Sequence, residues 1–200
     1  MLKKRILLSG HLVTLRGIDE RDFKKVVLWR NDPENNRYLN QPFKLTLEKQ
    51  KRWYYDKYMI SNDLLFVFVL NETGEQIGTL GANDIDYDNR KAIAGRLLIG
   101  KKQFRGSPEL LESNILFYDF LFEILGLKKV YCHIAEGNKK AMALDKRLGF
   151  HQNLDRIEYP QYCKVDNMNL IEMVNTKESY NESRQKLLPM LEHFILKKNK

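Results

Sequence analysis

Short apolar stretches alternate with polar turns along most of the chain, and their spacing separates strands from helices. Residues 64–70 form a continuous apolar run that is typical of a buried strand, whereas residues 11–17 alternate as a half-buried strand does. Apolar positions three and four residues apart indicate helices elsewhere. In chain order, the pattern predicts strands over residues 11–17, 64–70, 76–85, 91–100, 129–135 and 168–174, and helices over residues 19–31, 47–57, 108–125 and 138–148.

The last part of the chain has a helical pattern of its own. Leu187, Leu191 and Phe194 recur at helical spacing. Residues 175–200 are therefore predicted to form an added amphipathic helix after a main unit of residues 1–174. Its apolar face needs a partner surface, which we expect on the same domain or in a homodimer. A membrane is less favoured, because the segment is short and evenly charged.

The composition indicates one globular domain. Two hundred residues, 43% of them hydrophobic, can bury a core and leave some length for an appendage. The apolar stretches are shorter than a membrane span needs, and the start turns polar too quickly for a signal peptide, so we expect a cytoplasmic protein. Cys132 and Cys163 lack the spacing of metal ligands, and we expect buried free thiols and no metal site.

The charge balance raises the question of a nucleic-acid partner. A formal net charge of +8 would attract a phosphate backbone. The positive residues are scattered in short clusters, however, and do not gather on one helix with interleaved aromatic residues. We therefore expect no nucleic-acid partner and interpret the charge as a solvated surface that also helps to bind an anionic cofactor.

The clearest chemical signal lies between a predicted strand and a predicted helix. Residues 96–100 end the strand, and Gln103 to Pro108 form a glycine-containing turn before the helix. Such a turn directs backbone N–H groups and the positive end of the helix dipole into one small volume, so it is predicted to bind phosphate. A second signal follows the next strand, where Asn138 opens a helix and Gly149 ends it.

Together the two signals resemble the Gcn5-related N-acetyltransferases, the GNAT family. The family's cofactor signature is Q/R-x-x-G-x-G/A, and this chain has Gln103, Gly106 and Pro108 at those positions. Asn138 and a Leu-Gly-Phe run at residues 148–150 follow at the usual distance. An ordinary α/β domain would explain either signal alone, but not their order and spacing. The resemblance implies an α/β (α+β) fold with a mixed, mostly antiparallel central sheet and flanking helices, and acetyl-CoA as the acetyl donor.

The resemblance also implies where the cofactor lies. The strands at residues 91–100 and 129–135 would splay apart, and the pantetheine arm would pair with the first of them. The implied cofactor-binding residues are Leu98, Gly100, Gln103, Phe104, Arg105, Gly106, Ser107, Pro108, Asn138 and Ala141. Pro108 departs from the family pattern and has no N–H to donate, although proline suits the first turn of a helix. Asn138 is also explained as a plain helix cap.

Direct acetyl transfer needs a base for the amine proton and an acid for the leaving thiolate. His133 has a suitable intrinsic pKa and lies on the splayed strand, although a single strand histidine is more often structural. Asp145 stands where many relatives have a tyrosine that acts as the general acid. An ionised aspartate donates no proton unless burial raises its pKa, so an exposed helical charge is the simpler interpretation.

The acceptor amine is indicated by two local resemblances. Trp29, Arg30 and Asn31 resemble the branch that acetylates aminosugars on nucleotide carriers, although Trp29 is equally explained as a core residue. Residues 85–92 and 129–133 resemble spermidine acetyltransferases instead. The basic charge balance favours an anionic nucleotide-sugar amine. We expect it to enter between the helix end at Trp29, Arg30 and Asn31 and the strand end at Asn83 and Asp86.

Three rival functions remain at this stage. The leading hypothesis is an acetyl-CoA-dependent N-acetyltransferase of a small-molecule amine. Two alternatives use the same acetyl transfer with another acceptor. The acceptor would be a polyamine, or a protein N-terminus if the enzyme is associated with RNA or the ribosome. A non-catalytic acyl-CoA-binding module would suit Pro108, Asp145 and the added helix.

Overall fold

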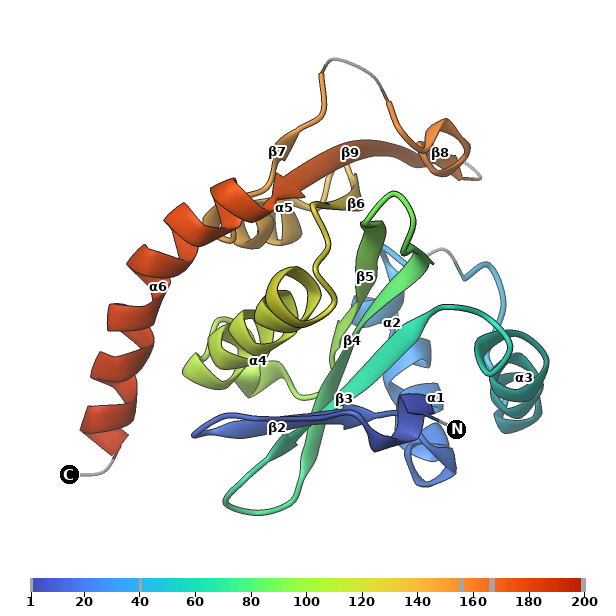
Figure 1. Ribbon diagram of the computed structural model, residues 1–200. Helices are drawn as coiled ribbons and strands as arrows, with labels where there is room; N and C mark the ends of the chain where they lie inside the picture. The colour runs from blue at the N-terminus through green and yellow to red at the C-terminus, as the bar shows by residue number, and fades with distance from the viewer. Residues whose placement is uncertain (1, 40, 155–156, 166–167, 199–200) are drawn as a thin grey trace.

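A single mixed sheet forms the centre of the molecule (Figure 1). The computed structural model describes residues 2–39, 41–154, 157–165 and 168–198, so the outermost residues of the two predicted units lie outside the described part. The strand order is β1-β2-β3-β4-β5-β6-β9-β7, with β8 paired to β9. The strands are β1 (Leu7–Ser9), β2 (Val13–Gly17), β3 (Leu64–Leu70), β4 (Gln76–Asp86), β5 (Lys91–Ile99), β6 (Lys129–Ala135), β7 (His151–Gln152), β8 (Lys164–Val165) and β9 (Met168–Thr176).

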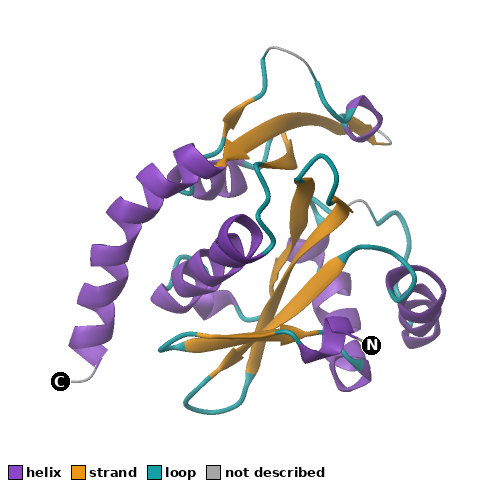
Figure 2. Cartoon of the chain, in the orientation of Figure 1, coloured by secondary structure: helices purple, strands orange, loops and turns teal. Residues whose placement is uncertain are grey.

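Helices cover both faces of the sheet (Figure 2). One buried cluster joins residues of α4 and α6 to the sheet, and a second joins residues of α1 and the segment after α3 to the other face. Among the described strands, β5 and β6 form the parallel pair, and the other pairs are antiparallel. The predicted fold class is thus confirmed. The helices are α1 (Phe23–Asn31), α2 (Pro33–Asn36), α3 (Leu47–Trp53), α4 (Pro108–Asp119), α5 (Lys139–Arg147) and α6 (Lys177–Lys198).

Strands β5 and β6 separate part of the way along their length. They pair only where Lys91–Ile93 meets Lys129–Tyr131. Beyond this point β5 continues along β4 to Ile99, while β6 continues along β9 to Ala135. The open backbone edges of β5 and β6 therefore face a gap in the sheet, as the resemblance implied.

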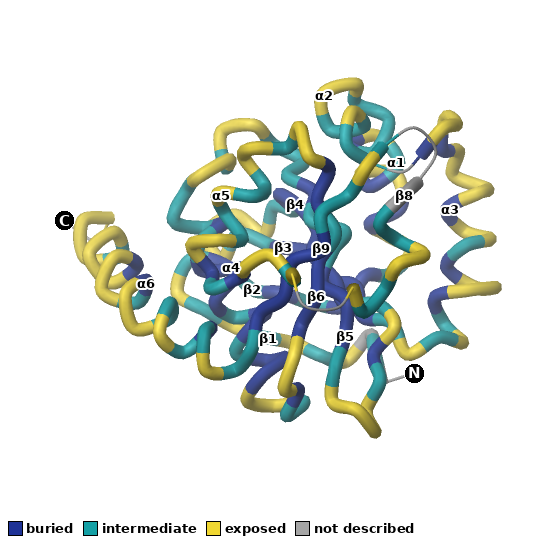
Figure 3. The backbone as a smooth tube through the Cα atoms, turned by 90° about the horizontal axis from the view of Figure 1, so that it is seen from above, coloured by how far each residue is buried: buried dark blue, intermediate teal, exposed yellow. Residues whose placement is uncertain are grey.

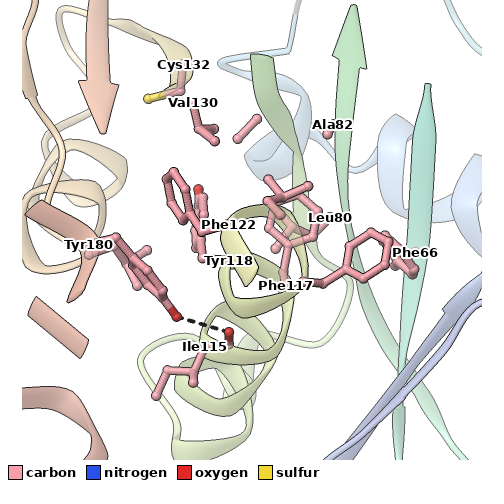
Figure 4. Packing of buried hydrophobic residues seen from close by; sticks show 14 of the residues in the cluster. Phe66, Leu80, Ala82, Ile115, Phe117, Tyr118, Phe122, Val130, Cys132 and Tyr180 are labelled. Carbon is pink, nitrogen blue, oxygen red and sulfur yellow. Dashed lines mark hydrogen bonds between the residues drawn. The ribbon is translucent and has the colours of Figure 1, made fainter. Parts of the chain in front are cut away.

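The C-terminal helix α6 packs on its own domain. Tyr180, Leu187 and Leu191 are its buried residues, and α6 lies beside α4. The Tyr180 hydroxyl lies within hydrogen-bond distance of the Ile115 carbonyl, at 3.1 Å (Figure 4), and of an Asp119 carboxylate oxygen, at 2.7 Å. The rest of the helix is largely exposed (Figure 3). The described helices include none that is long and apolar enough to cross a membrane.

The longer elements lie close to their predicted ranges, and the differences concern short or irregular segments. The predicted helices 47–57 and 108–125 each change to a π-helical turn, over Tyr54–Tyr58 and Phe120–Ile124. The structure adds β1, α2, β7 and β8, which the pattern did not predict. Elements of two to four residues contain too few positions to show a period.

Candidate active site

The predicted phosphate turn forms the entry to α4. Ser107 caps this helix by accepting a hydrogen bond from the Leu110 N–H at 3.3 Å, and Pro108 occupies the first turn. Gly106 has a φ of 76°, in the left-handed region that favours glycine. A Cβ atom built on Gly106 would meet nothing within 4 Å, so the turn leaves open space at this position. A ligand can therefore approach the backbone closely there.

The turn already uses several of the N–H groups that were predicted to bind phosphate. The N–H groups of Phe104, Arg105 and Ser107 donate to the carbonyls of Lys101, Lys102 and Phe104 at 3.0–3.2 Å. The described hydrogen bonds of this turn do not engage the Gly106 N–H. A bound phosphate would thus find one donor available and would share the others with loop carbonyls.

The cations of the turn are tied to α2. Lys102 contacts Glu34 at 2.7 Å, and Arg105 contacts the same carboxylate at 3.1 Å. These contacts hold Glu34 ionised, because hydrogen bonds from Lys102 and Arg105 lower its pKa. Gln103 is exposed. The segment after α2 also contacts the residues that follow β6. The Tyr38 hydroxyl donates to the Gly137 carbonyl at 3.0 Å.

The other predicted cofactor residues lie along the gap between β5 and β6. Leu98 is buried, and the Gly100 N–H donates to Ile77 of β4 at 2.8 Å. Asn138 caps α5 by accepting a hydrogen bond from the Ala141 N–H at 3.2 Å. The predicted helix cap at Asn138 is therefore confirmed. Because β5 and β6 are parallel, Asn138 and Ala141 follow the same open end of the gap as the phosphate turn, on the β6 side.

A cavity of about 410 Å³ lies on the sheet face that carries α1 and α3. Its lining includes Arg96 of β5, in the part of the strand that no longer pairs with β6. The cavity is lined by Val26, Arg30, Gln41, Phe43, Leu45, Lys49, Gln50, Arg52, Trp53, Asp56, Lys57, Leu65, Thr79 and Arg96. It therefore borders the strand against which the pantetheine arm is expected to lie.

The structure brings one predicted acceptor residue into this cavity. Arg30 lines it, and the Arg30 Nε donates to Gln41 at 2.7 Å. Trp29 instead belongs to the core, where its indole leaves no room for a Cβ at Gly100. Asn31 holds the loop before α3, because its amide exchanges two hydrogen bonds with the Leu45 backbone at 2.8 and 2.9 Å.

The predicted strand-end residues lie outside the cavity lining. Asp86 accepts hydrogen bonds from the backbone and side chain of Asn89 at 2.9 and 2.7 Å, and these bonds lower its pKa. It therefore stabilises the turn between β4 and β5. Asn83 lies on β4 and donates weakly to Asp84 at 3.4 Å.

His133 lies on β6, under the segment that contains Tyr159 and Tyr162. Its side chain is 7% exposed, and its Nε2 is 3.1 Å from a carboxylate oxygen of the fully buried Glu172. Burial lowers the pKa of His133 and outweighs the opposing effect of Glu172. The imidazole is therefore neutral at neutral pH.

Glu172 organises the loop above it. Burial alone would raise its pKa, but hydrogen bonds from Glu158 and Tyr159 N–H groups, Asn153 and His133 together lower it. The sequence pattern did not predict the contact between His133 and Glu172, because the two residues come from distant segments. Potential metal-ligand atoms of His133, Cys163 and Glu172 lie within 4.8 Å of one another. Both Glu172 carboxylate oxygens already accept hydrogen bonds, however.

Asp145 is not the exposed helical charge that the sequence favoured. Its side chain is half-buried against β6, where the Cys132 thiol donates to its carboxylate at 3.3 Å. Burial raises the pKa of Asp145 to about 6. The expectation failed because helical periodicity alone does not show how deeply α5 lies against the sheet. Cys132 is a buried free thiol as expected, whereas Cys163 is only half-buried.

Two bulges between β4 and β5 position Arg96, a cavity residue that the sequence analysis did not single out. Asp84 and Arg96 adopt left-handed φ values of 51° and 57°, which are uncommon for residues other than glycine. The Asp63 carboxylate accepts from the Asp84 N–H at 3.2 Å and from the Arg96 guanidinium at 2.7 Å. Asp63 thus stabilises both bulges, and the second bulge turns Arg96 into the cavity lining.

Known proteins similar to this chain include enzymes with named acceptors. The spermidine N(1)-acetyltransferase of Escherichia coli (strain K12) is 27% identical over 143 residues, which cover 71% of this chain and 74% of that protein. The uncharacterized N-acetyltransferase p20 of Bacillus licheniformis is 30% identical over 148 residues, covering 70% of this chain and 79% of that protein.

Solved structures show the same fold at lower identity. The apo form of FdhC, described as a nucleotide-linked sugar GNAT, matches with a TM-score of 0.72 and 18% identity over 93% of this chain and 98% of that one. The spermidine N-acetyltransferase from Vibrio cholerae, in complex with CoA and spermine, matches with a TM-score of 0.71 and 21% identity, over 86% and 99% of the two chains.

The family is shown by a match that spans most of the domain. Residues 13–151 match the family described as "Acetyltransferase (GNAT) domain", and this range contains the phosphate turn, the open strands β5 and β6, and α5. The chain therefore belongs to the GNAT acetyltransferases and is an N-acetyltransferase that uses acetyl-CoA as its acetyl donor.

Proposed function

We propose that this enzyme acetylates the primary amine of a small molecule in the cavity between α1, α3 and β5. One observation carries the proposal: the lining residue Arg96 belongs to the open part of β5. An amine in the cavity would therefore lie next to a thioester bound in the gap. The alternative function, a non-catalytic acyl-CoA-binding module, gains no support from Asp145, because the Asp145 carboxyl is half-buried and has a raised pKa.

The chain has the features that an acyl-CoA needs. The gap between β5 and β6 offers unpaired strand edges to an extended arm, and the open space at Gly106 admits a phosphate close to the backbone. The bound cofactor would supply a thioester carbon that the amine attacks directly. Leu98, Gly100 and residues 103–108 would bind it from the β5 side, and Asn138 and Ala141 would hold the arm from the β6 side.

Two groups on opposite faces of β6 would handle the protons. Neutral His133 is our proposed acceptor of the amine proton, and Glu172 would orient its ring through Nε2. Asp145 would protonate the leaving thiolate, because a carboxyl with a pKa of about 6 is a stronger acid than a thiol. Alternation along the strand puts His133 beside Tyr131 on one face and Cys132, with its partner Asp145, on the other.

Within this class, our proposed acceptor is a nucleotide-linked aminosugar. Arg30 lines the cavity and can hold phosphate through the two terminal nitrogens of its guanidinium, while its Nε binds Gln41. The likeness to a nucleotide-linked sugar GNAT gives this acceptor a precedent on the same fold. The named spermidine acetyltransferases make a polyamine the second candidate.

Free-thiol release from acetyl-CoA across a panel of amines tests the proposal. Nucleotide-linked aminosugars should support turnover, and Arg30→Ala should raise their KM at least about tenfold without changing acetyl-CoA affinity. Robust turnover with spermidine, together with inert nucleotide sugars, would refute the acceptor. A protein that binds acetyl-CoA and releases no thiol with any amine would refute the enzyme's proposed chemistry.

A further inference from the structure

Two buried donor atoms belong to residues that line the cavity between α1, α3 and β5 and have no hydrogen-bond partner among the described residues. They are the Arg96 Nη1 and the Gln50 Nε2, and both side chains line the cavity. Gln50 is only 3% exposed. A buried polar group without a partner costs free energy, and most native structures avoid it. Two such donors beside one cavity would gain partners from a ligand group that accepts hydrogen bonds when their side chains turn toward it.

Arg96 is held firmly in place for such a role. Its Nη2 donates to Asp63 at 2.7 Å, and its carbonyl accepts from the Thr79 hydroxyl at 2.9 Å. The guanidinium lies 5.1 Å from the centre of the Trp53 ring. The second terminal nitrogen, Nη1, is left for a ligand.

The charges around the cavity show which kind of ligand this is. Its lining contains five cationic side chains and a single carboxylate, that of Asp56. Burial and the nearby Arg96 lower the pKa of Arg30, so two like charges are held in a poorly solvated space. An anion would relieve this repulsion, whereas a polycation would increase it. The cationic residues are Arg30, Lys49, Arg52, Lys57 and Arg96.

We propose that this part of the cavity is a subsite for an oxyanion group of the acceptor, a phosphate or a carboxylate, held by Arg96, Gln50 and Arg30. The subsite deepens the proposed function, on which it rests, by making a negatively charged amine the substrate class. It also predicts that this enzyme differs from its relatives named for spermidine, since a fully cationic polyamine has no group to occupy it.

Calorimetric titration in a phosphate-free, low-salt buffer tests the subsite without acetyl-CoA. The probes are ethanolamine, O-phosphoethanolamine, β-alanine and spermidine, which separate phosphate, carboxylate and cation. At least one of the two anionic amines should bind at least about tenfold more tightly than ethanolamine, because charge-assisted hydrogen bonds form only with the oxyanion. If O-phosphoethanolamine binds more tightly than β-alanine, the subsite prefers a phosphate, and the reverse order indicates a carboxylate. Spermidine should bind no more tightly than ethanolamine.

Gln50→Met is the sharpest variant. Methionine keeps a similar volume and removes the unpartnered donor, so the protein should fold at least as stably as the wild type. Its affinity for the preferred anionic amine should nevertheless fall about tenfold, with ethanolamine unchanged. Arg96→Gln should lower the same affinity further. Arg90→Gln is the matched control, since Arg90 has a similar φ of 54° but is exposed in a turn outside the cavity.

The outcomes separate the subsite from the function on which it rests. Equal binding of all four probes, tightest binding of spermidine, or unchanged anion affinity in both cavity variants would overturn the subsite. If the anionic probes bind as expected but no amine releases thiol from acetyl-CoA, the subsite stands and the proposed function fails. If amines are acetylated with no preference for an oxyanion, the function stands and the subsite fails.

Discussion

At the scale of single residues, burial shifts the two proposed catalytic groups toward their neutral forms. His133 loses its proton more easily than a solvated histidine, and Asp145 keeps its proton up to a pH of about 6. A neutral base and a protonated acid are the forms that acetyl transfer to an amine requires. Each shift also has a consequence for stability that can be measured separately from activity.

Asp145→Asn should make stability less dependent on pH. The folded-state pKa of Asp145 lies about two units above its ordinary value of 3.8, so ionisation costs stability at high pH. The variant should be about 1–3 kcal/mol more stable than the wild type at pH 8. This gain should fall as the pH drops from 6 to 4, where the wild-type carboxyl takes up its proton. Urea unfolding at several pH values measures it, and a gain that does not change with pH would contradict the assigned pKa.

The same variant tests the proposed acid. If Asp145 donates the proton, Asp145→Asn should reduce kcat about a hundredfold at pH 6. The ratio of wild-type to variant kcat should shrink toward pH 8, because the wild type then loses its own protonated form. A constant ratio, or a loss within about threefold at pH 6, would exclude this role.

His133→Gln should lower kcat by about a hundredfold or more at neutral pH, because the proposed proton acceptor is removed. Acetyl-CoA affinity, measured by calorimetry, should stay the same. His151→Gln is a matched control, since His151 is exposed on β7. If both variants behave alike, another group takes the amine proton.

What the sequence could predict about single residues depended on how local their contacts are. The predicted cap at Asn138 is formed within one turn, and a short window shows it. Glu172 meets His133 across 39 positions, and Arg96 meets Asp63 across 33. The burial of Asp145 likewise comes from a different element. Contacts of this kind depend on the whole fold, so a local pattern cannot show them.

At the scale of elements, long periodic segments were predictable and very short ones were not. The strand Leu64–Leu70 has its predicted limits, because seven consecutive apolar residues fit between two sheet neighbours. The β5 bulge at Arg96 was not predicted, because the left-handed position is occupied by arginine and not by the neighbouring Gly95. This bulge nevertheless brings Arg96 to the cavity. The turn at residues 103–108, which follows β5, is where the predicted phosphate site can be tested.

Gly106→Val should weaken acetyl-CoA binding at least about tenfold. Valine is strained at a φ of 76°, and its side chain would fill the space that the phosphate needs. Gly74→Val is the matched control, because Gly74 has a φ of 69°, equally open surroundings and a place in the β3–β4 turn. Calorimetry should show the loss only at Gly106. Equal affinity in the two folded variants would move the phosphate site elsewhere.

Leu191→Ala should cost about 2–4 kcal/mol of unfolding free energy, because Leu191 is 6% exposed where α6 packs on the domain. Leu196→Ala should change it by less than about 0.5 kcal/mol, since Leu196 is 65% exposed on the same helix. Chemical denaturation of both variants checks this. Equal effects would mean that α6 does not pack on its own domain as described.

At the scale of the whole molecule, the separation of β5 and β6 organises the proposed chemistry. The phosphate turn lies at the end of β5, the capped start of α5 lies after β6, and the cavity proposed for the acceptor borders β5 at Arg96. The net charge of +8 agrees with two anionic ligands, a cofactor and an acidic acceptor. The order of two short motifs was enough to predict this plan, whereas the cavity needed the packing of α1 and α3.

The most direct test of the account follows the acetyl group itself. The enzyme is incubated with acetyl-CoA labelled in its acetyl group and with an equimolar mixture of ethanolamine, O-phosphoethanolamine, β-alanine and spermidine, and mass spectrometry locates the label. We predict one labelled acetyl group on an amine nitrogen for each thiol released, mainly on an anionic amine, with none retained by the protein. Label held on the protein, or found chiefly on spermidine, would contradict direct transfer to an anionic acceptor.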